Sequence, residues 1–237
     1  MEPVHGAKIK IRKAHDRGHA DHGWLNSWHT FSFADYHDPA HMGFRSLRVI
    51  NDDTVQGGMG FGTHPHRDME IISYVIDGAL EHKDSMGNGS VIRAGHVQRV
   101  TAGTGITHSE FNHSATALVH FLQIWIIPNQ RGLNPSYEEF QVRSAGGGIC
   151  LIASPDGADD SVTVHQDARL YFGRLAEDET VTHTTSVERG VWVQVVKGEL
   201  TVAGQPLSAG DGMSLEQVED IVIEAGGAGE FLLFDLA

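Results

Sequence analysis

The sequence predicts an all-β protein made of two tandem antiparallel β-barrel (jelly-roll) domains. From residue 44 onward, short apolar segments alternate with glycine and Asx turns, at the spacing typical of strands in an antiparallel barrel. No long amphipathic helix is evident in the sequence, and the tract 211–219 is at most a short one. The second half repeats the pattern of the first, which indicates two copies of one β-unit.

The N-terminal residues divide into a strand and a less regular segment. Residues 8–12 alternate basic and apolar side chains, which predicts a strand with one solvated face. Residues 14–42 are rich in histidine and aromatic residues but follow neither a helical nor a strand period. We expect an ordered irregular segment held by its aromatic rings. We expect its histidines to have surface or hydrogen-bonding roles rather than to bind metal.

The first half then contains a series of predicted strands. They cover residues 47–50, 70–76, 79–83, 91–100 with a break at 94–95, and 117–127. Asp77-Gly78 is a hairpin-type turn. The last of these strands is apolar on both faces, as expected for an interior strand, and it ends at Pro128.

The composition of residues 128–148 predicts a connector between two domains, because prolines, glycines and polar residues cannot supply a hydrophobic core. We therefore predict a first domain over residues 1–130 and a second domain over residues 131–237. The strands expected in the second half cover residues 148–153, 161–166, 168–173, 190–196, 199–202 and 231–234.

Composition limits the classes of function. The chain has 237 residues and a formal net charge of -14, which disfavours direct nucleic-acid binding because that binding depends on Lys and Arg neutralising phosphates. The single cysteine, Cys150, cannot form an intramolecular disulfide and is compatible with a reducing compartment. The N-terminus has no apolar signal-type segment and no long apolar run follows. We expect a cytoplasmic protein with no membrane span.

Two short pairs of residues predict a metal site. His64 and His66 have the spacing i, i+2, so in a strand both imidazoles point to the same face. His108 and Glu110 repeat this spacing with one imidazole and one carboxylate. Imidazole suits zinc, copper, iron and nickel, and the added carboxylate favours a harder ion such as Fe(II) or Mn(II).

Two alternatives remain open at this point. With 16 histidines in the chain, a His-x-His pair can arise by chance in a solvated loop. The glycine-rich turn before His64, the strand after it and the second pair downstream favour the metal site. Glu70 lies an even number of residues from His64 and His66, so in a strand its side chain would point to the same face as theirs. Spacing alone therefore does not decide between Glu70 and Glu110 as the carboxylate ligand.

The second half aligns with the first through a shared strand-turn pattern. Residues 73–80 match residues 193–200, each with a glycine before the last two positions. Extending this register places Thr184 and Ser186 opposite the His-x-His pair, and Ile223 and Ala225 opposite the His-x-Glu pair. The second copy is therefore predicted to keep the fold and to lack the metal ligands.

Several motifs resemble known families. Residues 58–78 have the spacing Gly-x5-His-x-His-x3-Glu-x7-Gly, which resembles the first cupin motif, and Gly95 with His108-x3-Asn112 resembles the second. More narrowly, residues 24–33, 47–53, 61–70 and 101–110 resemble the pirin family. The resemblance extends over nearly the whole first half. In the second half it rests mainly on the domain that is predicted to lack the metal ligands.

The pirin resemblance implies a bicupin fold with one divalent metal in the first domain. Carried over position by position, the implied ligands are His64, His66, His108 and Glu110. Glu70, the carboxylate ligand of a general cupin, then either supports the metal ligands from behind or has a structural role. The expected ion is Fe(II), with Mn, Co, Ni, Cu and Zn as alternatives.

The resemblance also implies an activity. Bacterial pirins of this kind are quercetin 2,3-dioxygenases, which cleave the flavonol quercetin with O2, so the implied substrates are a small flavonol-like aromatic molecule and O2. Glu110 is the expected catalytic proton acceptor for the flavonol 3-hydroxyl. The alternative is a metal-binding regulatory protein that acts through protein contacts, as eukaryotic pirins do. A third possibility is a cupin isomerase or a non-catalytic metal-binding protein. We expect a monomer.

Overall fold

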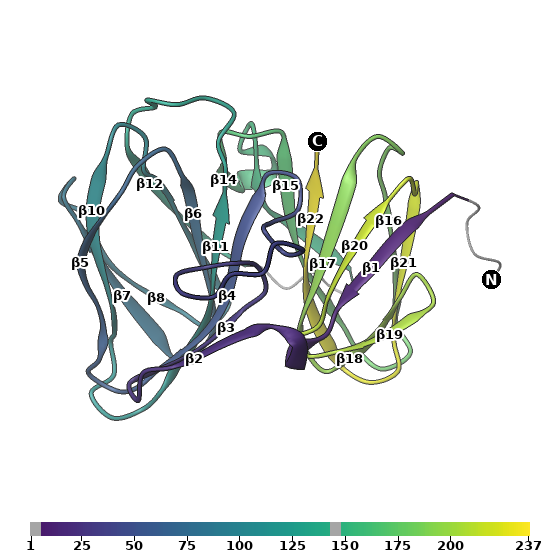
Figure 1. Ribbon diagram of the computed structural model, residues 1–237, viewed down its shortest axis with the longest axis horizontal. Helices are drawn as coiled ribbons and strands as arrows, with labels where there is room; N and C mark the ends of the chain where they lie inside the picture. Colours follow the sequence, from purple (N-terminus) through teal and green to yellow (C-terminus); the bar gives the residue numbers. More distant parts are fainter. Residues whose placement is uncertain (1–5, 143–147) are drawn as a thin grey trace.

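The structure is a computed structural model that describes residues 6–142 and 148–237. Its described residues form four separate sheets and two short 3-10 helices, η1 (Ala14–Asp16) and η2 (Ala158–Asp160). In each half of the molecule a seven-stranded sheet faces a four-stranded sheet (Figure 1). The predicted all-β, tandem jelly-roll class is confirmed, although the sheets stay separate rather than closing into barrels.

The strand orders are similar in the two domains. The first domain contains the order β12 (Ser136–Gln141), β9 (His96–Thr101), β6 (Glu70–Asp77), β11 (Val119–Ile126), β4 (Leu47–Val55), β3 (Leu25–His29), β2 (Gly18–Asp21), and the order β5 (Gly60–His66), β10 (Ile106–Asn112), β7 (Ala79–Asp84), β8 (Gly89–Arg93). The second domain contains the order β1 (Lys8–Arg12), β20 (Gly212–Glu216), β17 (Gly190–Lys197), β22 (Gly229–Leu236), β15 (Ala168–Leu175), β13 (Ile149–Ser154), β14 (Val162–Thr163), and the order β16 (Thr180–Thr184), β21 (Asp220–Ala225), β18 (Glu199–Val202), β19 (Gln205–Ser208).

Two strand pairings cross the predicted division at residue 130. β1 pairs with β20 and so adds the N-terminal strand to the sheet of the second domain. β12 lies within the expected connector but pairs with β9 of the first domain. Residues 143–147 of the connector lie outside the described residues. The division at residue 130 stays a prediction.

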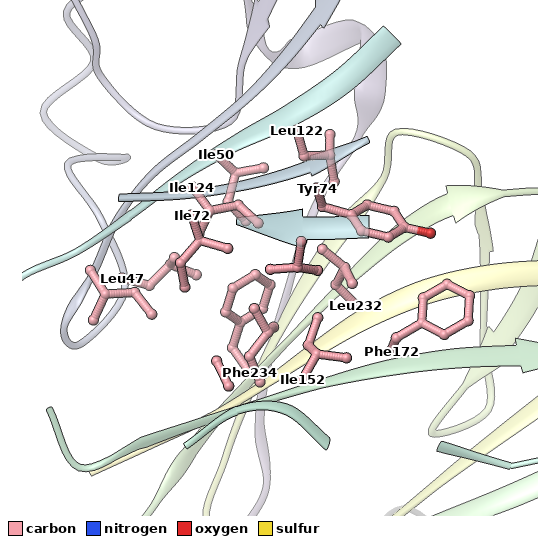
Figure 2. Close-up of a cluster of buried hydrophobic side chains, with 14 of the residues drawn as sticks. Leu47, Ile50, Ile72, Tyr74, Leu122, Ile124, Ile152, Phe172, Leu232 and Phe234 are labelled. Carbon is pink, nitrogen blue, oxygen red and sulfur yellow. The ribbon is translucent and has the colours of Figure 1, made fainter. Parts of the chain in front are cut away.

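The two seven-stranded sheets pack against each other through their apolar faces (Figure 2). Ile72 of β6 and Ile124 of β11 belong to the same buried cluster as Phe172 of β15 and Leu232 of β22. Fully burying a side chain of this size contributes about 1.5–3 kcal/mol. The apolar cluster therefore joins the two domains into one body and leaves the opposite face of each sheet to line its own domain.

The segment 14–42 is more regular than the sequence predicts. Residues Gly18–Asp21 and Leu25–His29 form β2 and β3, which pair with each other, and β3 also pairs with β4. Tertiary pairing with β4 therefore overrides the missing local period. The tract 211–219, expected to be at most a short helix, contains strand β20 instead.

The alignment of the two halves needs a correction in one strand. Leu80 pairs with Asn112 between β7 and β10, and Leu200 pairs with Ala225 between β18 and β21. Since Leu80 and Leu200 are matched positions, Ala225 corresponds to Asn112 and not to Glu110. The register extended from the sequence is wrong by two residues here, because short turns of different length intervene.

The corrected register also changes what the second domain retains. His64 pairs with His108 in the first domain, and His183 pairs with Ile221 at the matching place in the second. His183 therefore takes the position of His64. Its Nε2 is bonded to the Asp235 carboxylate at 2.9 Å, so this imidazole is engaged in a buried hydrogen bond.

Neither 3-10 helix, nor any other helix in residues 6–142 and 148–237, has the length and apolar character needed to cross a membrane.

Candidate metal centre

The structure brings the three predicted histidines together inside the first domain. β5 and β10 are antiparallel neighbours, and His64 lies directly opposite His108. The ring centroids are 4.5 Å apart for His64 and His108, 4.7 Å for His64 and His66, and 4.8 Å for His66 and His108. One nitrogen from each ring lies within 4.8 Å of the others. The i, i+2 spacing on a strand thus produces the convergence that the sequence predicts.

The donor atoms of this group fit a divalent ion. His64 Nδ1 donates to the Gly62 carbonyl at 2.8 Å, which leaves the lone pair of Nε2 free. This Nε2 lies 3.0 Å from His108 Nε2. Two nitrogens each about 2.1 Å from one ion, at roughly a right angle, are separated by about 3.0 Å. The histidine group therefore satisfies the donor type and the spacing of a metal site.

The protonation of these histidines also suits a metal. Burial, followed by the nearby imidazoles of His64 and His82, lowers the pKa of His108 to about 3. Burial, followed by the neighbouring imidazoles, lowers the pKa of His66 to about 4. Both rings are therefore neutral near pH 7, which is the form that binds metals.

Glu110 lies beside this group but is held by other side chains. Its carboxylate accepts hydrogen bonds from Gln98 Nε2 at 2.7 Å, Gln123 Nε2 at 2.6 Å and Ser73 Oγ at 3.0 Å. Its nearest group of potential ligands consists of His82, His108 and Glu110. Ionised carboxylates have about four acceptor positions, so the three bonds leave room for one more. The ligand role of Glu110 stays a prediction.

The partners of Glu110 belong to a polar row that crosses the seven-stranded sheet. Strand register aligns His29 with Asn51, Asn51 with Gln123, Gln123 with Ser73, and Ser73 with Gln98. Because alternate residues of a strand share a face, this row lies on the inner face of the first domain. The sequence does not reveal this row, because its five residues come from five different strands that only the fold brings side by side.

His82 is a site residue that the sequence reasoning missed. Its Nε2 lies 3.1 Å from Asp84 Oδ2, and both side chains are fully buried. Its ring stacks on Tyr137 at 4.8 Å and lies 5.3 Å from the ring of His108. Its Nδ1 is buried without a hydrogen-bond partner among residues 6–142 and 148–237. The His82-x-Asp84 spacing at the end of the predicted strand 79–83 was the available signal.

Glu70, the alternative carboxylate ligand, lies elsewhere. It belongs to neither group of converging donors in the described part of the chain. Its carboxylate accepts a hydrogen bond from Thr101 Oγ1 at 3.0 Å and lies 3.3 Å from His165 Nδ1 of the second domain. Burial raises its pKa, against the opposing effect of Arg99. Glu70 is therefore part of the contact between the domains.

A cavity of about 580 Å³ opens at the histidine group. His64, His66 and Glu110 line it, together with the aromatic rings of Trp125 and Phe61. Much of the remaining wall comes from the histidine-rich segment, through His19, His22, Trp24, His29, Phe33 and Tyr36. The sequence identified these residues as ordered but missed that they shape the cavity.

Asp53 is an unusual wall residue because it is a buried carboxyl group. It is 3% exposed, and Ser27 donates its hydroxyl to it. Burial raises the pKa of Asp53 to about 7, with the Ser27 hydrogen bond acting in the opposite direction. Near neutral pH this group is therefore protonated in a substantial fraction of molecules.

Comparisons with known proteins agree with this architecture. The Pirin family model matches residues 10–126, and the model of the quercetinase C-terminal cupin domain matches residues 151–236. Quercetin 2,3-dioxygenase of Escherichia coli K12 is 53% identical over 228 residues, which cover 96% of this chain and 98% of that protein.

Solved structures give the same result. The crystal structure of YhhW from Escherichia coli has a TM-score of 0.95 at 52% identity, covering 97% of this chain and 98% of that one. The structure of the bacterial pirin YhhW in complex with nickel(II) has a TM-score of 0.93 at 52% identity, covering 97% and 99%. With this identity over nearly its full length and the two tandem jelly rolls described above, the chain belongs to the pirin family of bicupin proteins.

Proposed function

We propose that this protein is a metal-dependent dioxygenase that cleaves a flavonol such as quercetin with O2. The observation that carries the proposal is a cavity with aromatic walls, lined by His64, His66 and the buried carboxylate of Glu110, at the point where the imidazoles of His64, His66 and His108 converge. The names of the relatives, quercetin 2,3-dioxygenases, point to the same reaction. A flat polyphenol suits such a cavity, because its rings can pack on the aromatic walls and its hydroxyl groups can bond to the polar side chains.

The proposed ligands are His64, His66, His108 and Glu110, which hold one divalent ion. Fe(II) is the proposed ion, because a carboxylate added to three imidazoles favours a harder metal. Mn, Co, Ni, Cu and Zn are the alternatives, and nickel(II) is the ion named in the YhhW complex. Four protein ligands leave coordination positions open for substrate.

The chain's own residues orient the substrate and accept a proton. Trp125 and Phe61 line the cavity beside the histidines, where they bind the flavonol rings and exclude water. Glu110 accepts the proton of the flavonol 3-hydroxyl, and Gln98 and Gln123 hold its carboxylate in place. The bound metal supplies Lewis-acid chemistry toward substrate oxygen atoms.

The reaction is tested by oxygen uptake. The full chain is stripped of metal, rebuilt separately with Fe, Mn, Co, Ni, Cu or Zn, and mixed with quercetin in an oxygen electrode. We expect uptake that depends on both the metal and the flavonol. Protein that binds one metal per chain but consumes no O2 with any of the six ions would exclude the dioxygenase.

The role of Glu110 is tested separately. Glu110→Gln keeps the shape of the side chain and one oxygen donor but loses the negative charge, so it should keep part of the metal and lose most turnover. Glu70→Gln should keep both, because Glu70 contacts Thr101 and His165 at the domain contact. A fully active Glu110→Gln protein beside a metal-free Glu70→Gln protein would reverse the assignment.

The proposal further includes a monomer in the cytoplasm. The two seven-stranded sheets bury their outer apolar faces against each other within one chain, which removes a common reason for dimer formation. The single cysteine is compatible with a reducing compartment. Light scattering of the purified protein tests the monomer directly, and a dimer mass would contradict it.

A further inference from the structure

The polar row on the inner face of the first domain has two ends with different bonding. At one end, Ser73, Gln98 and Gln123 use their polar atoms to hold Glu110. At the other end, Asn51 is 2% exposed and its Oδ1 is buried without a hydrogen-bond partner in the part of the chain that the structure describes. Unpaired buried polar atoms are costly and rare. This end of the row therefore has hydrogen-bonding capacity that the fold does not use.

His29, the neighbour of Asn51 in register, repeats this feature. It is 4% exposed, and its Nδ1 also lacks a hydrogen-bond partner among residues 6–142 and 148–237. Both residues line the cavity, as do Asp53 and Ser27 one step further along the same strands. Four polar side chains from β3 and β4 thus line the cavity at the end of the row that lies away from Ser73 and Gln98.

A series of aromatic rings connects the histidine group with this wall. The ring of His66 lies 5.1 Å from Trp125, Trp125 lies 5.4 Å from Phe33, and Phe33 lies 5.3 Å from His29. An elongated aromatic molecule with one end at His66 would lie along Trp125 and Phe33. Its other end would then reach His29 and Asn51.

We propose that His29 and Asn51, with Asp53 beside them, form a subsite that recognises phenolic hydroxyl groups on the ring of the substrate farthest from the histidine group. A phenol both donates and accepts hydrogen bonds, and an asparagine amide offers both functions. The inference rests on the proposed function for its ligand class, a flavonol. It adds that hydroxyl groups on the distal ring determine specificity.

The test measures binding to metal-free protein without O2, so that neither the metal nor turnover contributes. Three flavonols are titrated that share the fused ring system and carry two, one or no hydroxyl groups on the distal ring. In the wild type we expect the dihydroxylated flavonol to bind about tenfold more tightly than the unsubstituted one, the effect of one or two well-formed hydrogen bonds.

Asn51→Leu keeps the size of the side chain and removes its polar atoms. We expect the tenfold preference to fall to about twofold or less, while the unsubstituted flavonol binds as in the wild type. Asn26→Leu is the matched control. Asn26 lies on β3 three residues from His29, so its side chain points to the other face of the strand, outside the cavity lining. It should keep the full preference.

A second variant covers the possibility that Asn51→Leu does not fold. His29→Phe removes Nδ1 and keeps an aromatic ring next to Phe33, and it should reduce the same preference. Equal binding of the three flavonols by the wild type, or an equal loss for all three in either folded variant, would overturn the subsite.

Together with oxygen uptake, these measurements distinguish a failure of the subsite from a failure of the proposed function. Metal-loaded wild type that consumes O2 with all three flavonols but binds them equally would overturn the subsite alone. A clear binding preference in a protein that consumes no O2 with any metal would overturn the dioxygenase and leave the subsite in place.

Discussion

Gln123 donates its Nε2–H to Glu110 Oε2 at 2.6 Å, and the two residues come from opposite sheets of the first domain. Gln123 lies on β11 of the seven-stranded sheet, and Glu110 lies on β10 of the four-stranded sheet. The carboxylate that is proposed to accept a proton is therefore oriented from across the interior. Its position depends on the packing of the two sheets and not only on its own strand.

Gln123→Leu should reduce the rate of turnover. The substitution removes the donor to Glu110 Oε2 and leaves that oxygen free to move away from the substrate. Loss of a residue that orients a metal-site ligand typically costs about 10- to 100-fold in activity or metal affinity. Oxygen uptake with quercetin measures the effect. Gln205→Leu, at an exposed position on β19, is the control, and equal rates in the two variants would show that Glu110 does not need Gln123.

The metal-free protein should lose stability as the pH falls below about 6.5, in part because of His108. The pKa of His108 is about 3 in the fold, against 6.5 as its ordinary value. Below pH 6.5 the unfolded chain takes up a proton that the folded chain does not, so the stability present above pH 6.5 is lost toward pH 3. The slope is roughly 1.4 kcal/mol per pH unit.

Urea unfolding of wild type and His108→Asn between pH 7 and pH 5 measures this effect. The variant has no titrating group at this position, so its stability should depend less steeply on pH. Equal slopes in the two metal-free proteins would contradict the assignment.

Asp53 should have the opposite pH dependence. Its pKa is about 7 in the fold and 3.8 ordinarily, so the folded chain holds a proton that the unfolded chain has released. Its contribution to stability is present below pH 3.8 and is lost as the pH rises through 7. The stability of Asp53→Asn relative to wild type should therefore rise by roughly 1.4 kcal/mol per pH unit between pH 4 and pH 7 and level off above pH 7. A constant difference in unfolding free energy across this range would show that the Asp53 carboxyl group is not protonated in the fold.

The contact between the domains should contribute strongly to stability. Leu232 lies on β22 in the apolar cluster between the two seven-stranded sheets and is fully buried (Figure 2). Leu232→Ala should cost about 2–5 kcal/mol of unfolding free energy. Leu118→Ala, at a side chain that is 55% exposed, is the matched control and should stay within about 0.5 kcal/mol of wild type. A small effect of Leu232→Ala would mean that the two domains are stable without this contact.

The sequence predicts the features of this fold that follow local rules. Alternation, glycine turns and the two copies of one strand pattern give the all-β class, and the i, i+2 spacing of His64 and His66 gives their convergence. These predictions succeed because strand parity fixes the direction of a side chain wherever the strand is paired.

The features that the sequence does not predict depend on pairing between distant strands. Asn51 and Gln123 become neighbours only through the register of β4 and β11. His29 reaches the cavity because β3 pairs with β4, and no local period in residues 14–42 indicates a strand. Lys8–Arg12 is correctly predicted as a strand, but its partner, β20, is some 200 residues away.

Metal content of the full chain tests the central claim most directly. Wild type and variants are loaded with metal, dialysed against a mild chelator and measured by elemental analysis. We expect one equivalent per chain in the wild type, loss of the metal in a His64→Ala/His108→Ala double variant, and full retention in His183→Ala, which alters the matching position of the second domain. Stoichiometric metal in the double variant, together with its loss in His183→Ala, would contradict a metal centre in the first domain.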